Sequence, residues 1–273
     1  MVFWGLEMTE MLREGDVLRL QRAFAHCKDE SFFEHFRRLL RARLRFDTFL
    51  ILRFSDSGTP QALDSWLADC SLKTSYPRHY LDGSYRLDPF FQMRKRASPG
   101  AMYRLSEIAP DRFFSGEYYL QYYCKTEICD EVGLLVDLKG GATGHLSMSR
   151  QAGQGRFKRK ELQCLRHFSP VMLELLRQYC EFRQDQLGER VQPPVHSPLD
   201  TIIRDHVTAL SGTVLTRREA QLAALILQGH SNLSAALDLG IARATVKVHR
   251  RNIYRKLDIS SQAELFAALK DLF

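Results

Sequence analysis

A proline-rich segment in the second half of the chain divides it into two parts. Residues 184–198, QDQLGERVQPPVHSP, contain three prolines within six residues and almost no large apolar side chain. Because proline cannot continue a helix and the segment has little to bury, we interpret it as an interdomain linker. The sequence therefore predicts a regulatory domain at 1–185, a linker at 186–198 and a second domain at 199–273.

The composition agrees with two folded domains. Hydrophobic residues make up 45% of the chain and charged residues 26%, which is enough apolar material for packed cores. No apolar run is long enough to span a membrane, and the first residues, MVFWGLEMTEMLREGD, lack the basic start and cleavage site of a signal peptide. We therefore expect a cytoplasmic protein that does not contact a membrane.

No cofactor, metal site or enzymatic activity is expected. The six cysteines, at positions 27, 70, 124, 129, 164 and 180, form no C-x-x-C pair and have no ligand cluster beside them. The glycines at 140–144 lack the Gly-Lys-Ser/Thr ending of a phosphate loop, so we interpret them as a turn. No set of nucleophile, base and orienting residue is apparent, which argues against an enzyme.

The N-terminal domain is predicted to mix helices and strands. Apolar residues at helical spacing indicate helices, and short apolar runs such as TFLILRF indicate strands. The expected elements are helices at 31–45 and 159–182 and strands at 48–54, 132–138 and 145–149, the last two forming a β-hairpin. Helices around an antiparallel sheet give an α+β sensor domain with a PAS- or GAF-like layout.

The C-terminal domain is predicted to be all-α, with four short helices. Thr216 and Glu219 have the spacing of a capping box that starts the first helix, and Gly229 is placed to end it. The other three helices are expected over 232–239 with Asn232 as N-cap, over 243–257, and from a second capping box at Ser261 to near Leu272. Because Gly240 supplies a tight turn between the second and third helices, this is a helix-turn-helix layout.

The third of these helices is expected to present a basic face. At about 100° per residue, Val246, Ile253 and Leu257 fall on one side and must face the core. The opposite side carries Lys247, Val248, Arg251 and Arg255. Residues 243–256 contain six basic residues and no acidic one, which suits a helix that meets phosphates and guanine edges in the major groove. A solvated cationic face on an ordinary helix would explain the charge equally well.

Three motifs in this domain resemble the LuxR/FixJ family of helix-turn-helix regulators. They are Leu215-Thr216-x-Arg218-Glu219, Gly229-x-Ser231-Asn232 and Thr245-Val246-Lys247-x-His249-Arg250-x-Asn252-Ile253-x-x-Lys256-Leu257, within a resemblance that covers about 215–269. The resemblance implies a transcription regulator that binds double-stranded promoter DNA as a homodimer, with the third helix in the major groove and the fourth helping dimerisation. Two-fold symmetry then predicts an imperfect inverted repeat in the DNA, and RNA polymerase is a further candidate partner.

The resemblance and the helical wheel agree on which side chains read bases. Positions matching Lys247, Val248 and Arg251 approach bases in relatives of this family, and the wheel exposes the same three. The full set of expected DNA contacts is Lys247, Val248, Arg251, Arg255, Thr245, Asn232 and Lys256. The expected dimer contacts are Leu265, Phe266 and Leu269, because the last helix carries more apolar surface than it needs to dock on a small core. The chain departs from the family at Ala242, where a serine usually caps the third helix.

Part of the N-terminal domain resembles the acyl-homoserine-lactone-binding domain found in one branch of this family. The resemblance runs from Tyr76-Pro77 to Asp88-Pro89-Phe90 and over Gly133–Ser149, and it implies that Asp88 binds a ligand amide. The candidate ligand-binding residues are Asp88, Tyr80, Tyr85, Tyr103 and Trp66. The family's upstream tryptophan falls near Ser75 and its downstream tryptophan is replaced by Tyr103, so we expect a related, quorum-sensing-like pocket for another ligand. An Asp-Pro step also favours a simple turn, and both interpretations of Asp88 stay open.

The favoured function is a transcription regulator controlled by a small-molecule effector. The alternative is the same DNA-binding role with an N-terminal domain that binds a protein partner or only mediates dimerisation. A phosphorylatable receiver domain is discarded, because Ser55-Asp56 follows the strand at 48–54 and the further acidic and lysine residues of a receiver do not appear in the required pattern.

Overall fold

The computed structural model describes residues 14–55, 60–69, 77–94, 100–187 and 197–273. They form two compact units, each of which gathers separate stretches of the chain. The first unit holds the described residues within Met1–Lys73, Arg96–Arg104 and Ile128–Pro194, and the second holds those within Thr74–Lys95, Leu105–Glu127 and Val195–Phe273. Residues 188–196 of the predicted linker lie outside the described residues, so the domain limits stay a prediction.

The first unit is built on a five-stranded antiparallel sheet with the strand order β2-β1-β5-β4-β3. Its strands are β1 (Thr48–Phe54), β2 (Gln61–Leu67), β3 (Ala101–Arg104), β4 (Ile128–Asp137) and β5 (Thr143–Gln151). The predicted strand at 48–54 and the predicted hairpin are confirmed. Gly140 and Gly141 have φ angles of +74° and +75° in the hairpin turn, a left-handed conformation that favours glycine.

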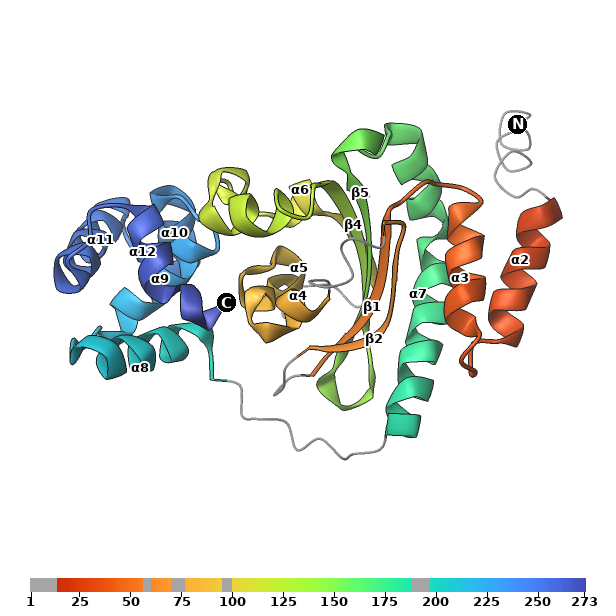
Figure 1. Cartoon of the computed structure of the whole chain (residues 1–273), viewed down its shortest axis with the longest axis horizontal. Coiled ribbons are helices and arrows are strands. Elements are labelled where there is room, and N and C mark those ends of the chain that lie inside the picture. Colours follow the sequence, from red (N-terminus) through yellow and green to blue (C-terminus); the bar gives the residue numbers. More distant parts are fainter. Residues whose placement is uncertain (1–13, 56–59, 70–76, 95–99, 188–196) are drawn as a thin grey trace. The chain divides into compact units, whose positions relative to one another are not determined.

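Three helices complete the first unit: α2 (Glu14–Ala25), α3 (Phe32–Arg41) and α7 (Arg159–Leu187). Figure 1 shows α3 and α7 running along one face of the sheet. The core between them contains alternate strand residues and the facing helix residues, among them Phe49, Ile51, Leu134, Leu146, Phe32, Phe36, Leu176 and Tyr179. α7 continues through Gln184 to Leu187, so the interpretation of 184–198 as unable to form a helix is wrong for its first turn, where QDQL contains no proline or glycine.

The second unit contains all four helices predicted for the C-terminal domain. They are α9 (Arg217–Leu227), α10 (Asn232–Leu239), α11 (Arg243–Leu257) and α12 (Gln262–Leu269), followed by a 3-10 turn at Lys270–Leu272. A further helix that the sequence did not predict, α8 (Leu199–Ser211), precedes them. The capping box at Thr216 and Glu219 is confirmed. The N-cap of α10 is Ser231 and not Asn232, because the Ser231 hydroxyl accepts hydrogen bonds from the amides of Leu233 and Ser234.

The middle of the chain adds short helical segments to the second unit. They are α4 (Arg78–Asp82), α5 (Pro89–Met93), α6 (Leu105–Ile108), 3-10 turns at Ser84–Leu87 and Phe113–Ser115, and a π-helical turn at Tyr119–Tyr123. Rings of Tyr118, Tyr122 and Tyr123 pack against one another around that turn. Within the described ranges, no helix has the length and apolar character needed to cross a membrane.

Candidate DNA-binding surface and effector site

Helix α11 is fixed by the side chains on its inner face. Val246 and Ile253 are completely buried, as the helical wheel predicts, and α11 packs on both α9 and α10. Gly240 ends α10 with a φ angle of +64°, which gives the tight turn that leads to α11. Ala242 occupies the N-cap of α11 without a side-chain hydrogen bond, as expected from the absence of a serine.

The outer face of α11 is exposed and basic. The side chains of Thr245, Lys247, Val248, Arg251 and Arg255 all lie on this exposed face. Val248 is 46% exposed, which leaves its methyl groups accessible. The helix carries no acidic residue, so nothing within it neutralises the basic face. Such a surface can attract phosphates and present both donors and methyl groups to base edges.

The first residue of α10 lies beside α11. Asn232 is half-buried, and its side-chain oxygen accepts a hydrogen bond of 3.3 Å from Arg250 Nη1. Arg250 Nε also donates to the Tyr254 hydroxyl at 3.0 Å. These contacts connect the start of α10 to the middle of α11. The role of Arg250 in positioning Asn232 was not recognised from the sequence, because the two residues are eighteen positions apart and no local pattern links them.

Lys256 differs from the exposed basic residues of α11 because its ammonium group contacts the start of α9 and the residues before it. Lys256 Nζ lies 2.7 Å from the carboxylate of Glu219 and donates to the carbonyl oxygen of Val214 at 3.0 Å. Burial raises the pKa of Glu219, but hydrogen bonds from Lys256 and Thr216 outweigh it and the net pKa is lowered. The Lys256 side chain therefore joins the end of α11 to the start of α9.

The apolar residues predicted to form the dimer contact are buried within the chain itself. Leu265 and Leu269 are 0% and 1% exposed, and Phe266 stacks on Phe273 with ring centroids 5.8 Å apart. The expectation that α12 has apolar surface to spare is therefore wrong for these three side chains. The outward face of α12 instead carries Ala263, Ala267 and Ala268.

The second unit brings together three of the five predicted ligand-binding residues. The Tyr80 hydroxyl donates to Asp88 Oδ2 at 2.6 Å, and the ring of Tyr85 lies 6.3 Å from that of Tyr80. Asp88 Oδ1 accepts a hydrogen bond of 2.9 Å from the Phe90 amide, so the carboxylate is the N-cap of α5, with Pro89 in the first turn. The turn interpretation of Asp88 thus describes what its side chain does in this structure.

The Asp88 carboxylate is desolvated. Only 3% of the residue is exposed, and burial raises the pKa of Asp88 to about 6 although Tyr80 and the amides of Phe90 and Phe91 donate to it. Burial, together with the charge of Asp88, raises the pKa of Tyr80 as well. Each carboxylate oxygen has further lone pairs, so the group can accept an additional donor.

Tyr103 and Trp66 belong to the first unit and lie on opposite faces of its sheet. Trp66 pairs with Phe49 on the face that α3 covers, and the guanidinium groups of Arg37 and Arg41 each lie 4.6 Å from its ring centroid. Tyr103 pairs with Gly133 and follows Met102, which packs into the helix-covered core. Because neighbouring strand residues point to opposite faces, Tyr103 points away from that core.

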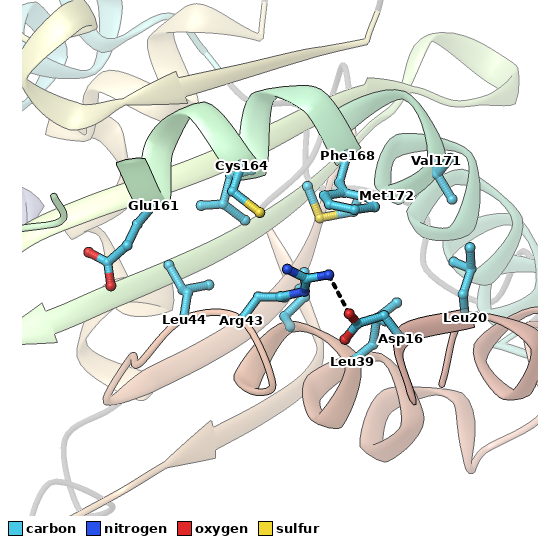
Figure 2. Close-up of a pocket in the computed structure, with 12 residues that line it drawn as sticks. Asp16, Leu20, Leu39, Arg43, Leu44, Glu161, Cys164, Phe168, Val171 and Met172 are labelled. Carbon is cyan, nitrogen blue, oxygen red and sulfur yellow. Dashed lines mark hydrogen bonds and ion pairs between the residues drawn. The ribbon is translucent and has the colours of Figure 1, made fainter. Parts of the chain in front are cut away.

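A separate small cavity lies among α2, α3 and α7 (Figure 2). Its volume is about 40 Å³, and its wall is mostly apolar, with Phe168 and Met172 of α7 opposite Leu39 of α3. Inside it, Arg43 forms an ion pair with Asp16. A space of this size holds a few water molecules, whereas sites for drug-sized ligands occupy roughly 300–1,000 Å³. None of the predicted ligand-binding residues lines it, so it is not the candidate effector site.

Comparisons with known proteins point to transcription control. Residues 213–268 match the model of the family described as bacterial regulatory proteins, luxR family. A protein of Aeromonas salmonicida named as an HTH-type transcriptional regulator in the exeN 3' region is 34% identical over 179 residues, which cover 66% of this chain and 91% of that protein. The response regulator protein TodT of Pseudomonas putida is 49% identical over 51 residues, 19% of this chain and 22% of that protein.

A solved structure shares the fold of the N-terminal part. The VqsR LBD domain from Pseudomonas aeruginosa is similar with a TM-score of 0.53 and 24% sequence identity, covering 62% of this chain and 99% of that chain. This likeness concerns the α+β architecture. It agrees with the antiparallel sheet and flanking helices predicted from the sequence.

Proposed function

We propose that α11 enters the major groove of promoter DNA, because this chain belongs to the LuxR family of bacterial regulatory proteins and is a DNA-binding transcription regulator. The observation that carries this proposal is the exposed face of α11, which is basic and has no acidic residue within it. Lys247 and Arg251 are assigned to base edges and Val248 to a thymine methyl group. Thr245 and Arg255 are assigned to phosphates. Asn232, at the start of α10, is assigned to the sugar-phosphate backbone of the DNA.

Lys256 is left out of the proposed DNA contacts. Its ammonium group binds the buried carboxylate of Glu219, and moving it to a phosphate would leave that carboxylate without its cation. We assign Lys256 a structural role between α9 and α11.

Selection of binding sites from random DNA by the full chain tests the proposal. The wild type is expected to enrich one sequence, arranged as an imperfect inverted repeat if the protein binds as a homodimer. Lys247→Ala is expected to lose or relax that preference. Lys270→Ala, which removes an exposed positive charge elsewhere in the same unit, is the matched control and should enrich the wild-type sequence. If the wild type and Lys247→Ala enrich the same sequence equally well, α11 does not read DNA in the way proposed.

The effector proposal centres on Asp88, Tyr80 and Tyr85. The Asp88 carboxylate is desolvated and accepts hydrogen bonds from the Tyr80 hydroxyl and the Phe90 amide. It can accept a further hydrogen bond from a ligand N–H or O–H, which supports the proposal. Tyr103 stays a prediction. Trp66 is dropped from the proposed set, because its ring already packs against the guanidinium groups of Arg37 and Arg41.

In the alternative, the N-terminal part binds a protein partner or only mediates dimerisation. The hydrogen bonds that Asp88 already accepts from its own chain favour this alternative. Titration calorimetry of the full chain with acyl-homoserine lactones and a metabolite library separates the two. Heat of binding that disappears in Asp88→Asn supports the effector site, and no heat with any compound supports the alternative.

The remaining parts of the proposal follow from the family. The protein acts in the cytoplasm as a homodimer without enzymatic activity of its own, and RNA polymerase is the partner through which bound regulator would change transcription.

A further inference from the structure

Two stretches from the middle of the chain are docked onto the DNA-binding helices within the second unit. In the first contact, the Arg112 amide donates to the carbonyl oxygen of Gly229 at 2.9 Å. Next to it, Asp111 Oδ1 accepts a hydrogen bond of 2.9 Å from the Ser231 amide. Both partners lie in the turn that leads into α10, so residues 111 and 112 form a clasp on the start of this helix.

In the second contact, the turn between α4 and α5 lies against the C-terminal end of the chain. Arg86 Nη1 donates to the carbonyl oxygen of Leu272 at 3.1 Å, and Gln228 Nε2 donates to the carbonyl oxygen of Arg86 at 3.4 Å. Arg86 therefore bridges two places in the helix-turn-helix part, the end of α9 and the residues after α12.

The backbones approach so closely at both contacts that only glycine fits. A Cβ atom on Gly229 would lie 2.6 Å from Phe113 Cα, and one on Gly83 would lie 2.6 Å from the Leu272 carbonyl oxygen. Gly229 is also required locally, because its φ angle is +92°. Gly83 has a φ angle of 166°, an extended conformation open to any residue. The close approach to the C-terminal end is therefore the reason for glycine at position 83.

The first contact occupies a place that a DNA phosphate would need. In helix-turn-helix complexes the first helix of the motif crosses the DNA backbone, and helix N-termini donate to phosphate oxygens. Here that helix is α10, and the amide at its N-cap donates to the carboxylate of Asp111. The neighbouring residue, Asn232, is one of the proposed DNA contacts. A carboxylate and a phosphate carry the same sign of charge and accept the same hydrogen bond, so they compete for this amide.

We infer that the docked stretches around Asp111 and Gly83 hold the DNA-binding helices in an autoinhibited state, in which the Asp111 carboxylate takes the place of a DNA phosphate at the start of α10. DNA and the clasp then exclude each other. The apparent dissociation constant for DNA equals the intrinsic constant divided by the fraction of molecules in which these stretches are undocked, so docking raises it. An effector that shifts the middle stretches would control DNA binding by changing this fraction. This inference rests on the proposed function, because it assumes that α10 and α11 bind DNA.

The test compares variants of the full chain for binding to a fluorescein-labelled, mixed-sequence DNA duplex by anisotropy. Asp111→Ala removes the carboxylate and Gly83→Ala forces the second contact apart, while neither residue belongs to the proposed DNA surface. We expect Asp111→Ala to bind about threefold tighter and Gly83→Ala about tenfold tighter than the wild type, as one or two modest hydrogen bonds are lost from the docked state. Asp111→Asn, which keeps an acceptor and loses the charge, should fall between the wild type and Asp111→Ala.

Matched controls are Asp137→Asn and Gly153→Ala, both at exposed positions of the first unit. A Cβ atom added to Gly153 meets nothing within 4 Å. Both should bind like the wild type. Unchanged or weaker binding by the folded Asp111 and Gly83 variants overturns the inference. Failure of the proposed function looks different, because wild type, Asp111→Ala and Lys247→Ala would then bind the duplex equally poorly.

Hydrogen exchange on the wild-type chain gives a second measurement that needs no substitution. If DNA displaces the clasp, the Arg112 amide loses its bond to Gly229 and should exchange faster when the duplex is added. Slower or unchanged exchange at Arg112 in the DNA complex would mean that the clasp stays closed on DNA, and the inference would be wrong.

Discussion

The ammonium group of Lys256 lies 2.7 Å from the carboxylate of Glu219 and joins the last turn of α11 to the first turn of α9. Glu219 also accepts a hydrogen bond from the Thr216 amide at 2.8 Å, so one buried carboxylate caps a helix and holds a lysine. The pair thereby fixes the angle at which the basic face of α11 is presented.

Lys256→Ala is expected to lower the melting temperature of the full chain, because it leaves the Glu219 carboxylate buried without its cation. The Lys256 side chain is 29% exposed, so we expect a loss of about 1–3 kcal/mol, below the 3–5 kcal/mol typical of a fully buried pair. The lowered pKa of Glu219 means that its contribution is present above the unfolded pKa and is lost as pH falls through the folded one. Melting curves from pH 7 down to about pH 3 should therefore show the difference from wild type shrinking. A stable Lys256→Ala variant with weak DNA binding would restore Lys256 to the DNA surface.

Lys247→Ala and Arg251→Ala are expected to weaken binding to the selected DNA site without changing the melting temperature. Both side chains are exposed on α11 and have no part in the core. A good contact to a base edge contributes about 1–3 kcal/mol of discrimination, which corresponds to a loss of roughly 5- to 150-fold. Anisotropy with specific and random duplexes measures the difference. An equal loss on both duplexes would show that the two residues contact phosphates and not bases.

Features that depend on a few neighbouring residues could be predicted from the sequence. The capping box at Thr216 and Glu219, the turn at Gly240 and the inner residues Val246 and Ile253 all follow from local spacing, and the structure has them as predicted. The same holds for the strand at 48–54. The N-cap of α10 was misassigned because Ser231 and Asn232 are adjacent and both are good caps, so the pattern alone does not choose between them.

Features that depend on distant residues could not be predicted. Lys256 is basic and belongs to a basic helix, but its partner Glu219 is 37 positions earlier in the chain. Trp66 and Tyr103 are both aromatic, yet the face that each occupies is decided by strand register, and β1 and β2 contain an irregularity between Ile51 and Leu52. For the same reason the docking of residues 111 and 112 on α10 has no signature in the sequence.

If the chain forms the proposed homodimer through α12, Ala267→Arg is expected to convert that dimer into a monomer. The buried apolar residues of α12 leave Ala263, Ala267 and Ala268 on its outward face, and these small side chains allow a second copy of the helix to approach. In a two-fold contact the substitution appears twice, so two bulky cations face each other in the interface. Light scattering after size exclusion should show a dimer dissociation constant at least tenfold higher than that of the wild type. Ala152→Arg, at an exposed position of the first unit, is the control, and an Ala267→Arg variant that remains dimeric would place the interface elsewhere.

Asp88→Asn is expected to change how stability depends on pH. Burial raises the folded-state pKa of Asp88 to about 6, above the 3.8 that is usual for the group, so the fold favours the protonated acid. The stability that this contributes is present at low pH and is lost as pH rises from about 4 through 6. Asparagine is neutral throughout and can still accept from the Phe90 amide. The variant should therefore gain on the wild type by an amount on the order of 2 kcal/mol between pH 4 and pH 7.

Melting temperatures of both proteins over this pH range measure the effect. Asp82→Asn, at an exposed aspartate in the same part of the second unit, is the control. If Asp88→Asn instead loses stability progressively toward pH 7, the ionised carboxylate is favoured by its donors, and its pKa lies below the usual value. That result would make Asp88 a structural cap only. The expected result means that the ionised carboxylate of Asp88 is disfavoured until it accepts a further hydrogen bond. A ligand N–H could supply that hydrogen bond. Such a ligand would raise the melting temperature of the wild type but not of Asp88→Asn.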